Sequence, residues 1–237
     1  MGRSRLDKLL SDSGRFTRSQ AREAIRAGRV RVNGSVVRKP EEKFDAESDT
    51  VSADGETLNC LPMRYLMLHK PAGVLSATDD EKQRTVLDLL PPELRKQGLF
   101  PVGRLDKDTT GLLLLTNDGD FAHRVTAPKK HVPKRYRATL DGPVTEADAA
   151  AFAGGVTLGD GTQCLPAHLE IEAPNVGIVT VFEGKYHQVK RMFAARGRTV
   201  TALHRECIGA LELDAALGPG EYRPLYVEER AAIFRNM

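Results

Sequence analysis

The chain has 237 residues, 41% of them hydrophobic and 28% charged, which are the proportions of a globular protein large enough for two domains. Its net charge of +3 is modest, and no apolar run approaches the roughly 20 residues of a membrane-spanning helix. The Arg-rich start lacks the apolar segment of a signal peptide, so the composition argues against a membrane partner and predicts a cytoplasmic protein.

The cysteines and the distribution of charge narrow the class further. Cys60, Cys164 and Cys207 are far apart and odd in number, which argues against a disulfide framework and against a Cys-rich zinc site. Residues 1–44 hold twelve Lys and Arg against five Asp and Glu, a net charge of +7, whereas residues 45–60 carry five acids and no base. A concentrated basic segment of this kind indicates a polyanionic partner.

The basic segment is predicted to form two short helices. Apolar residues at helical spacing in residues 5–10 predict the first helix, with Gly14 as its end. Thr17 and Gln20 stand at the two positions of a capping box, and the second helix, which they begin, is expected to end at Gly28.

Arginines recur along the second helix at steps of three or four residues, so they share one face. No acid lies among them, and this arginine stripe is therefore predicted to bind RNA phosphates, with a solvated helix face as the alternative. After the stripe, alternating residues on either side of Asn33-Gly34 predict a two-residue β-hairpin. The stripe consists of Arg18, Arg22, Arg26 and Arg29.

A domain boundary is expected where the periodicity of the sequence is lost, in residues 56–63. The chain would then consist of a domain of residues 1–60 and a domain of residues 61–237. In the second domain, strand patterns such as residues 64–69 and 176–182 alternate with a few helices but without a regular βαβ repeat. This pattern is typical of an α+β fold and not of a dinucleotide-binding fold.

The centre of the second domain sets a polar loop against an apolar run. The four leucines 112–115 are followed by the turn residues Asn117, Asp118 and Gly119, a pattern typical of a strand buried on both faces. A carboxylate beside a buried strand is costly unless it is paired or takes part in chemistry. Asp106 is therefore the first candidate for a catalytic group, with a simple turn cap as the alternative.

A basic segment with an aromatic residue follows, in residues 128–140. Lys129 and Lys130 could hold phosphates, and the ring of Tyr136 could stack on an unpaired base, so the segment is a candidate for RNA binding. The alternative is an exposed edge strand that its charges keep soluble.

A later helix is expected to stop at Gly197. Lys190 and Arg191 fall in its first turns, where the helix dipole favours anions, and both are candidates for contacts with the substrate. His187 and His204 are isolated from other metal-binding residues, so they are interpreted as structural or RNA-contacting residues and not as metal ligands.

Several blocks of the sequence resemble one family. Gly103-Arg104-Leu105-Asp106, followed by Thr109-Thr110-Gly111-Leu112, is similar to the catalytic signature of pseudouridine synthases. Three later blocks resemble the RsuA branch of that family, namely residues 183–193, 203–205 and 220–225. The two N-terminal helices and the hairpin, about residues 3–55, resemble the S4 RNA-binding domain.

The resemblance implies an enzyme that isomerises a specific uridine to pseudouridine in ribosomal RNA, without a metal or a cofactor. It implies a small S4-like α/β RNA-binding domain, followed by a catalytic domain with a mixed, largely antiparallel sheet flanked by helices. The last blocks are most similar to the members that modify small-subunit (16S) rRNA, free or in an assembly intermediate, and large-subunit (23S) rRNA is the alternative. A monomer is expected.

The resemblance also assigns roles to single residues. Asp106 would be the nucleophile, or the base that starts cleavage of the glycosidic bond. Lys190 matches a cation that pairs with the catalytic acid, a position that is often Arg in the wider superfamily. Tyr136 matches an active-site tyrosine that stacks on uracil. Arg104 would contact RNA phosphate or orient the loop, and Leu203 would pack under the base.

Two alternatives of other classes stay open. A non-catalytic, ribosome-associated S4 protein would bind RNA and leave its uridines unchanged. A metal-dependent enzyme would use Asp106, Asp108 and Asp118 as an acidic cation site. With Asp106 as the catalytic carboxylate, Asp108 and Asp118 are interpreted as turn residues instead.

Overall fold

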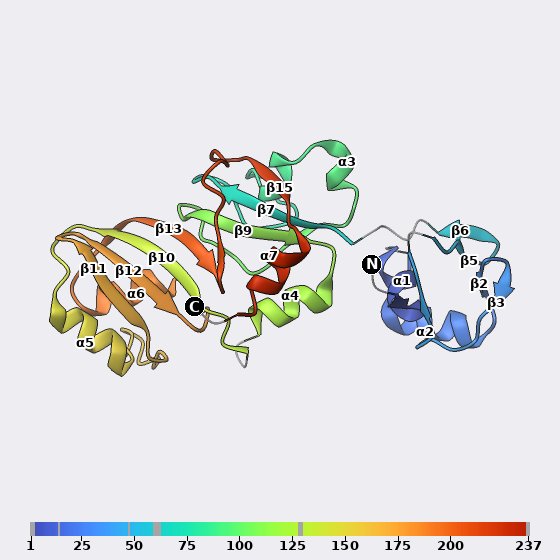
Figure 1. The fold of residues 1–237 in the computed structure, drawn as a ribbon, viewed down its shortest axis with the longest axis horizontal. Coiled ribbons are helices and arrows are strands. Elements are labelled where there is room, and N and C mark those ends of the chain that lie inside the picture. Colours follow the sequence, from blue (N-terminus) through green and yellow to red (C-terminus); the bar gives the residue numbers. More distant parts are fainter. Residues whose placement is uncertain (1–2, 14, 47, 59–62, 128–129, 236–237) are drawn as a thin grey trace. The chain divides into compact units, whose positions relative to one another are not determined.

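The computed structural model describes residues 3–235 except for residues 14, 47, 59–62 and 128–129 (Figure 1). The chain divides into two compact units, residues 1–63 with 96–98 and residues 64–95 with 99–237. Among the described residues, each helix is too short or too polar to cross a membrane.

The first unit consists of two helices and a small sheet. The helices are α1 (Leu6–Asp12) and α2 (Arg18–Arg26). The antiparallel sheet has the order β3-β2-β5-β6, from strands β2 (Val30–Val32), β3 (Ser35–Val36), β5 (Val51–Ala53) and β6 (Glu56–Leu58). A separate pair is formed by β1 (Ser4–Arg5) and β4 (Lys43–Phe44).

Local signals in the sequence account for these elements, and the expected second helix and hairpin are confirmed. The amide of Gln20 donates to Thr17 Oγ1 at 3.3 Å, and the amide of Thr17 donates to Gln20 Oε1 at 2.8 Å, which completes the capping box. Asn33 and Gly34 have φ of +50° and +82°, as a tight two-residue hairpin requires. The expected stop of the first helix at Gly14 lies outside the described residues.

The second unit is built on a nine-stranded sheet with the order β11-β12-β10-β13-β9-β7-β15, to which β14 and β8 are added at β13 and β9. Its described strand pairs are antiparallel except for β9 with β13. The expected α+β class with a mixed, largely antiparallel sheet is confirmed. The strands are β7 (Tyr65–Lys70), β8 (Phe100–Pro101), β9 (Thr110–Thr116), β10 (Lys134–Leu140), β11 (His168–Ala173), β12 (Val176–Val181), β13 (Val200–Ile208), β14 (Leu211–Glu212) and β15 (Tyr222–Pro224).

Helices flank the sheet at both of its ends (Figure 1). At the end of β7 and β9 lie α4 (Gly119–Thr126) and α7 (Val227–Ala232). At the end of β10, β11 and β12 lie α5 (Glu146–Gly154) and α6 (Gln188–Ala195). A 3-10 helix (Val86–Leu89) and α3 (Pro92–Arg95) occupy the connection between β7 and β8.

Strand β9 is buried on both faces, as its four leucines predicted. Leu113 and Leu115 belong to one apolar cluster, and Leu112 and Leu114 belong to another. A third cluster lies beneath α5 and α6. Tyr136 packs against both the third cluster and the cluster of Leu113, so its ring lies where two apolar cores meet on one face of the sheet.

Candidate active site

Four residues of neighbouring strands stand in one row across the sheet. Lys70 of β7 is paired with Gly111 of β9, Gly111 with Arg205 of β13, and Arg205 with Tyr136 of β10. Paired residues direct their side chains to the same face. Gly111 has φ of +104°, and a Cβ there would lie 2.3 Å from the carbonyl oxygen of Arg205, so the close approach of β9 and β13 requires glycine.

A small pocket of about 80 Å³ opens beside this row. Four of the residues that the sequence singled out line it together: Arg104 and Asp106 from the loop before β9, Tyr136 from β10, and Leu203 from β13. The opposite wall comes from residues between 181 and 189, which connect β12 to α6. The pocket therefore joins segments that lie far apart in the sequence.

The carboxylate of Asp106 lies between two basic side chains, His187 of the opposite wall and Lys190 of α6, which is outside the pocket lining. Lys190 Nζ is 3.0 Å from its Oδ2, and His187 Nε2 is 3.3 Å from its Oδ1. Lys190 Nζ also donates to Asp108 Oδ1 at 2.6 Å. Burial alone would lower the pKa of Lys190, but its hydrogen bonds to Asp108 and Asp106 outweigh burial and raise that pKa.

Asp108 is part of this ion-pair cluster. Its hydrogen bond from Lys190 lowers its pKa, so the acid stays ionised next to the ammonium group. Asp108 lies in a turn, as interpreted, but α6 also brings Lys190 to it from 82 residues further along the chain. Asp118 does cap a turn, since its Oδ1 accepts from the amides of Asp120 and Phe121 at the start of α4.

The acidic cation site expected by the metal-dependent alternative is not formed. Asp106 and Asp108 precede β9, whereas Asp118 follows it, so the three carboxylates do not meet. Within the described part of the chain, no three His, Cys, Asp or Glu side chains are grouped as a metal site would require.

A buried lysine that the sequence analysis missed lies beneath the Asp106 loop. Lys70 Nζ donates to the carbonyl oxygens of Asp106 at 3.0 Å, Lys107 at 3.2 Å, Thr109 at 2.8 Å and Pro71 at 3.1 Å. Burial lowers the pKa of Lys70 to about 8. Most of its partners are carbonyls 36 to 39 residues away, and a side-chain pattern cannot indicate contacts with the backbone.

A second buried cation supports Tyr136. Arg205 is 3% exposed, and its Nε donates to the carbonyl oxygen of Leu112 at 2.7 Å. Its Nη1 donates to Tyr136 Oη at 3.3 Å. Among the described residues, Arg205 Nη2 and Thr109 Oγ1 are buried without a hydrogen-bond partner. Buried polar atoms without a partner are rare in folded proteins. Because Thr109 lines the pocket, its hydroxyl group is available for a hydrogen bond with a polar group of a ligand.

Two further candidates, Arg191 and Lys130, do not line this pocket. Arg191 Nη2 forms an ion pair with Asp160 Oδ2 at 2.5 Å, and it is not part of the described pocket wall. Lys130 lines a different cavity, next to Phe234. Lys129 lies outside the described residues.

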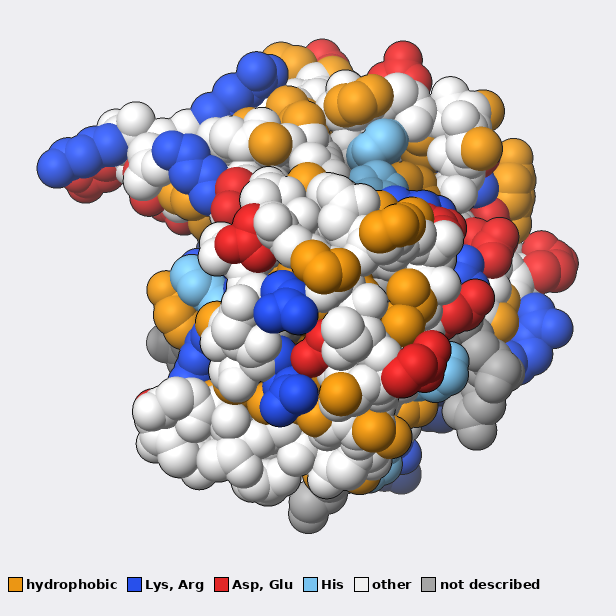
Figure 2. Space-filling view, turned by 90° about the vertical axis from the view of Figure 1, so that its left-hand side faces the viewer, with side chains coloured by type: hydrophobic (Ala, Val, Ile, Leu, Met, Phe, Trp, Pro, Cys, Tyr) orange, Lys and Arg blue, Asp and Glu red, His pale blue; other side chains and the backbone are white. Residues whose placement is uncertain are grey.

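The residues that alternate with the pocket residues on β10 and β13 line the other face of the sheet, at a larger cavity of about 440 Å³. There Glu206 accepts from Arg135 at 3.2 Å and from Arg137 at 2.9 Å. The edge-strand alternative for the basic segment is wrong, since β10 is an interior strand. Its arginines are paired with acids, and RNA binding by the segment stays a prediction. Basic and acidic side chains are also interspersed on the face drawn in Figure 2.

The arginine stripe of the first unit is exposed, as expected, but it is not free of acids. The buried carboxylate of Asp7 accepts from Arg22 Nε at 2.9 Å and lies 3.9 Å from Arg18 Nε. Asp54 lies 3.5 Å from Arg29. These acids come from α1 and from the turn after β5, so the spacing of residues within one helix could not show them.

Known proteins are similar to this chain along nearly its whole length. A family model described as RNA pseudouridylate synthase matches residues 64–195, and one described as S4 domain matches residues 4–51. The chain is 46% identical to the ribosomal small subunit pseudouridine synthase A of Escherichia coli, over 97% of this chain and 99% of that protein.

Two further comparisons agree. The chain is 45% identical to YtzG of Bacillus subtilis, described as an uncharacterized RNA pseudouridine synthase, over 95% of this chain and 96% of that protein. A crystal structure of a pseudouridylate synthase matches the fold with a TM-score of 0.71 and 43% identity, over 97% of this chain and 99% of that chain.

Proposed function

We propose a reaction for this chain, which belongs to the RNA pseudouridylate synthase family: the isomerisation of one uridine to pseudouridine in small-subunit (16S) ribosomal RNA. The reaction breaks the bond between C1′ and N1, turns the uracil, and joins C1′ to C5, while C5 loses its proton and N1 gains one. Nothing is oxidised and no phosphate is transferred. The observation that carries the proposal is the carboxylate of Asp106, placed in a pocket between Lys190 and His187.

Asp106 is the reacting group in this proposal. Its carboxylate either attacks the nucleoside or acts as the base that starts cleavage of the glycosidic bond. Lys190, at 3.0 Å, holds one of its oxygens and balances its charge. Lys70 donates to the carbonyl oxygen of the same residue, so the backbone that carries the carboxylate is fixed from below. Asp106 thus meets the substrate in one prearranged position.

Tyr136 and Leu203 receive the uracil. A base inside folded RNA must leave its stack first, which costs a few kcal/mol, and an aromatic ring in the pocket returns part of that energy by stacking. The ring of Tyr136 is fixed between two apolar cores and by the bond from Arg205. The buried side chain of Leu203 supplies an apolar floor in the same pocket.

The RNA backbone is held by exposed cations. Residues 1–60 serve as the RNA-binding domain and residues 61–237 as the catalytic domain. The exposed residues Arg18, Arg22, Arg26 and Arg29 contact phosphates, and Arg104 does so at the rim of the pocket. Each neutralised phosphate releases counterions, so if about six phosphates are contacted in all, a rise in salt from 50 to 200 mM should weaken binding roughly a thousandfold.

The small-subunit target rests on the relative from Escherichia coli, whose name states that specificity and which matches nearly the whole chain. The substrate is free 16S rRNA or an assembly intermediate of the small subunit, in the cytoplasm. The protein acts as a monomer.

The test is pseudouridine mapping of both ribosomal RNAs from cells with the protein, without it, and with an Asp106→Asn variant. We expect one 16S position to lose pseudouridine in the deletion and to stay unmodified in the variant. Loss of pseudouridine at a position of 23S rRNA instead would mean that the reaction is the proposed one but that its target is the large-subunit RNA. Unchanged maps would overturn the proposal.

A further inference from the structure

An exposed aromatic pair stands at the rim of the pocket. Tyr186 and His187 stack with ring centroids 3.8 Å apart and an interplanar angle of 20°. Tyr186 is 75% exposed, the most of any large hydrophobic side chain in the described residues. Since His187 covers one face of its ring, this exposure requires that the other face be open to solvent. We call the pair the aromatic shelf.

The shelf is continuous with the pocket of the proposed reaction. His187 lines the pocket and lies 3.3 Å from the carboxylate of Asp106, while Tyr186 extends the aromatic surface outward from it. A group that stacks on Tyr186 would therefore be a close neighbour of the group that enters the pocket. In an RNA chain, that neighbour is the next nucleotide.

The segment that carries the shelf is fixed in place. Arg191 Nη1 donates to the carbonyl oxygen of Tyr186 at 3.3 Å, and Arg191 is itself paired with Asp160. The amide of Lys185 donates to Gln188 Oε1 at 3.0 Å, just across the shelf. A ring that is held before binding loses little conformational freedom when a ligand stacks on it.

The backbone of His187 is also constrained. It has φ of +49°, in the left-handed region that residues other than glycine rarely adopt. Residues in such conformations persist where the surrounding structure over-determines them, and they cluster at functional sites. Here the conformation starts α6 while the imidazole keeps its contacts with both Tyr186 and Asp106.

We propose that the aromatic shelf of Tyr186 and His187 binds a nucleobase that neighbours the target uridine in the substrate RNA. This inference rests on the proposed function. Every base has a flat face that can stack on an aromatic ring, and such stacking is independent of the base sequence.

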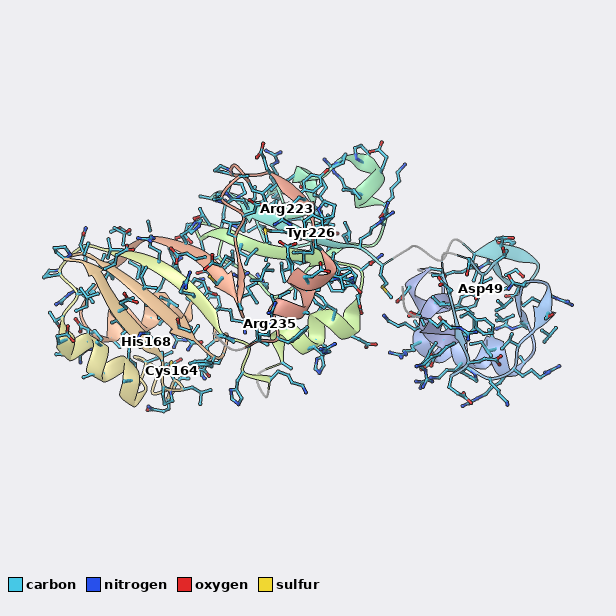
Figure 3. The ribbon with its side chains drawn as sticks, in the orientation of Figure 1. Asp49, Cys164, His168, Arg223, Tyr226 and Arg235 are labelled. Carbon is cyan, nitrogen blue, oxygen red and sulfur yellow. The ribbon has the colours of Figure 1, made fainter. Side chains whose placement is uncertain are left out.

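The test compares two exposed tyrosines. Tyr226 is 65% exposed, and its ring centroid lies 5.5 Å from Cζ of Arg223, which Figure 3 labels beside it. Tyr226 does not line the described pocket. Tyr186→Leu and Tyr226→Leu make the same chemical change at the two sites. The dissociation constant of a 16S rRNA fragment is measured by fluorescence anisotropy, and pseudouridine formation is measured on the same fragment.

We expect Tyr186→Leu to weaken binding about tenfold, within the range for one lost base–aromatic stack. Tyr186→Phe, which keeps the ring, and Tyr226→Leu should each stay within about twofold of wild type. Equal affinities of Tyr186→Leu and Tyr226→Leu would overturn the shelf.

Abasic nucleotides placed one at a time in the fragment identify the base. In the wild type, one position should lose about tenfold in affinity, and that loss should vanish in Tyr186→Leu because the shelf is already missing. The same loss in both proteins at every position would contradict the proposal. A wild type that forms no pseudouridine would remove the proposed function, while the affinities would still decide whether the shelf binds a base.

Discussion

Strands β10 and β13 line a different cavity on each face of the sheet, and the two cavities differ in size and in the pairing of their charges. On one face, Tyr136 and Leu203 line a pocket of about 80 Å³ next to Asp106. On the other face, Arg137 and Glu206, from the same two strands, line a cavity of about 440 Å³. The larger cavity has its charges neutralised, since the carboxylate of Glu206 accepts from two arginines.

In the proposed reaction the smaller cavity is the site of chemistry, so the volume of a cavity alone would not identify it. In the small pocket, the buried hydroxyl oxygen of Thr109 has no hydrogen-bond partner among the described residues. The carboxylate of Asp106 there lies within 3.3 Å of the basic side chains of His187 and Lys190. Perturbed or unsatisfied polar groups around a pocket are typical of functional sites, whereas paired charges are typical of structural contacts. Substitutions on the two faces should therefore differ in what they change.

Asp106→Asn should have the largest effect. The amide keeps the shape of the side chain but cannot attack the nucleoside or accept a proton as the carboxylate would. Turnover should therefore fall by roughly a thousandfold or more. The dissociation constant for RNA should stay within a few-fold of wild type.

Asp108→Asn is the matched control, because Asp108 accepts from the same Lys190 but does not line the described pocket. It should lose less than about tenfold in turnover, as expected for a support of Lys190. If the two variants lost equal activity, the assignment of Asp106 as the reacting carboxylate would be wrong.

Lys70→Met should have the next largest effect, and the effect should be a loss of stability in the loop that carries Asp106. Methionine leaves the buried carbonyl oxygens of the Asp106 loop without their donor, which should cost about 2–3 kcal/mol of unfolding free energy. Lys134→Met is the control, since burial also lowers the pKa of Lys134 to about 8, but within the described residues its ammonium group has no hydrogen bond or ion pair. Lys134→Met should leave stability unchanged or raise it. Denaturant unfolding measures both, and equal losses would contradict the role of Lys70.

The pH dependence of stability gives a second readout for Lys70. Its pKa is about 8 in the folded chain against an ordinary 10.5, so the unfolded chain binds more protons between these values. The contribution of Lys70 to the unfolding free energy is therefore constant below about pH 8 and rises with pH up to about 10.5. The wild type should gain stability relative to Lys70→Met across this window, and parallel curves would contradict the shift.

The sequence could predict elements whose cause is local. The capping box at Thr17, the turn at Asn33-Gly34 and the doubly buried strand of four leucines each depend on a few neighbouring residues, and all three are present. The candidates Asp106 and Tyr136 could be singled out because their motifs are contiguous, although their roles are proposals.

What the sequence could not predict depends on contacts between distant segments. The carbonyl partners of Lys70 and the partner of the Tyr136 hydroxyl, Arg205, come from strands that only the folded sheet brings together. The same reason explains the error of the edge-strand alternative for the basic segment, since the interior place of β10 and the pairing of its arginines with Glu206 depend on other strands. Charge patterns along one segment cannot show neutralisation by another.

Arg205→Lys should have a smaller effect, and a double-mutant cycle can separate its causes. Lysine keeps the positive charge but loses the fixed donors of the guanidinium group, so turnover should fall about tenfold if Arg205 orients the hydroxyl of Tyr136. In a Tyr136→Phe background, which lacks that hydroxyl, the same substitution should cost less than about twofold. Arg137→Lys on the other face is the matched control and should stay near wild type. A tenfold loss in both backgrounds would show that Arg205 acts through the sheet and not through Tyr136.

Glu206→Gln should have the smallest effect, and it tests the other face directly. Glu206 is partly exposed and joins Arg135 to Arg137, and each arginine keeps a second acid, Glu212 or Glu172. Removal of one shared charge should therefore lower the unfolding free energy by about 1 kcal/mol, with a smaller loss at high salt, and leave turnover within about twofold. A large loss of turnover in a stably folded Glu206→Gln would mean that the larger cavity takes part in the reaction. The contrast between a neutralised face and a reacting face would then be lost.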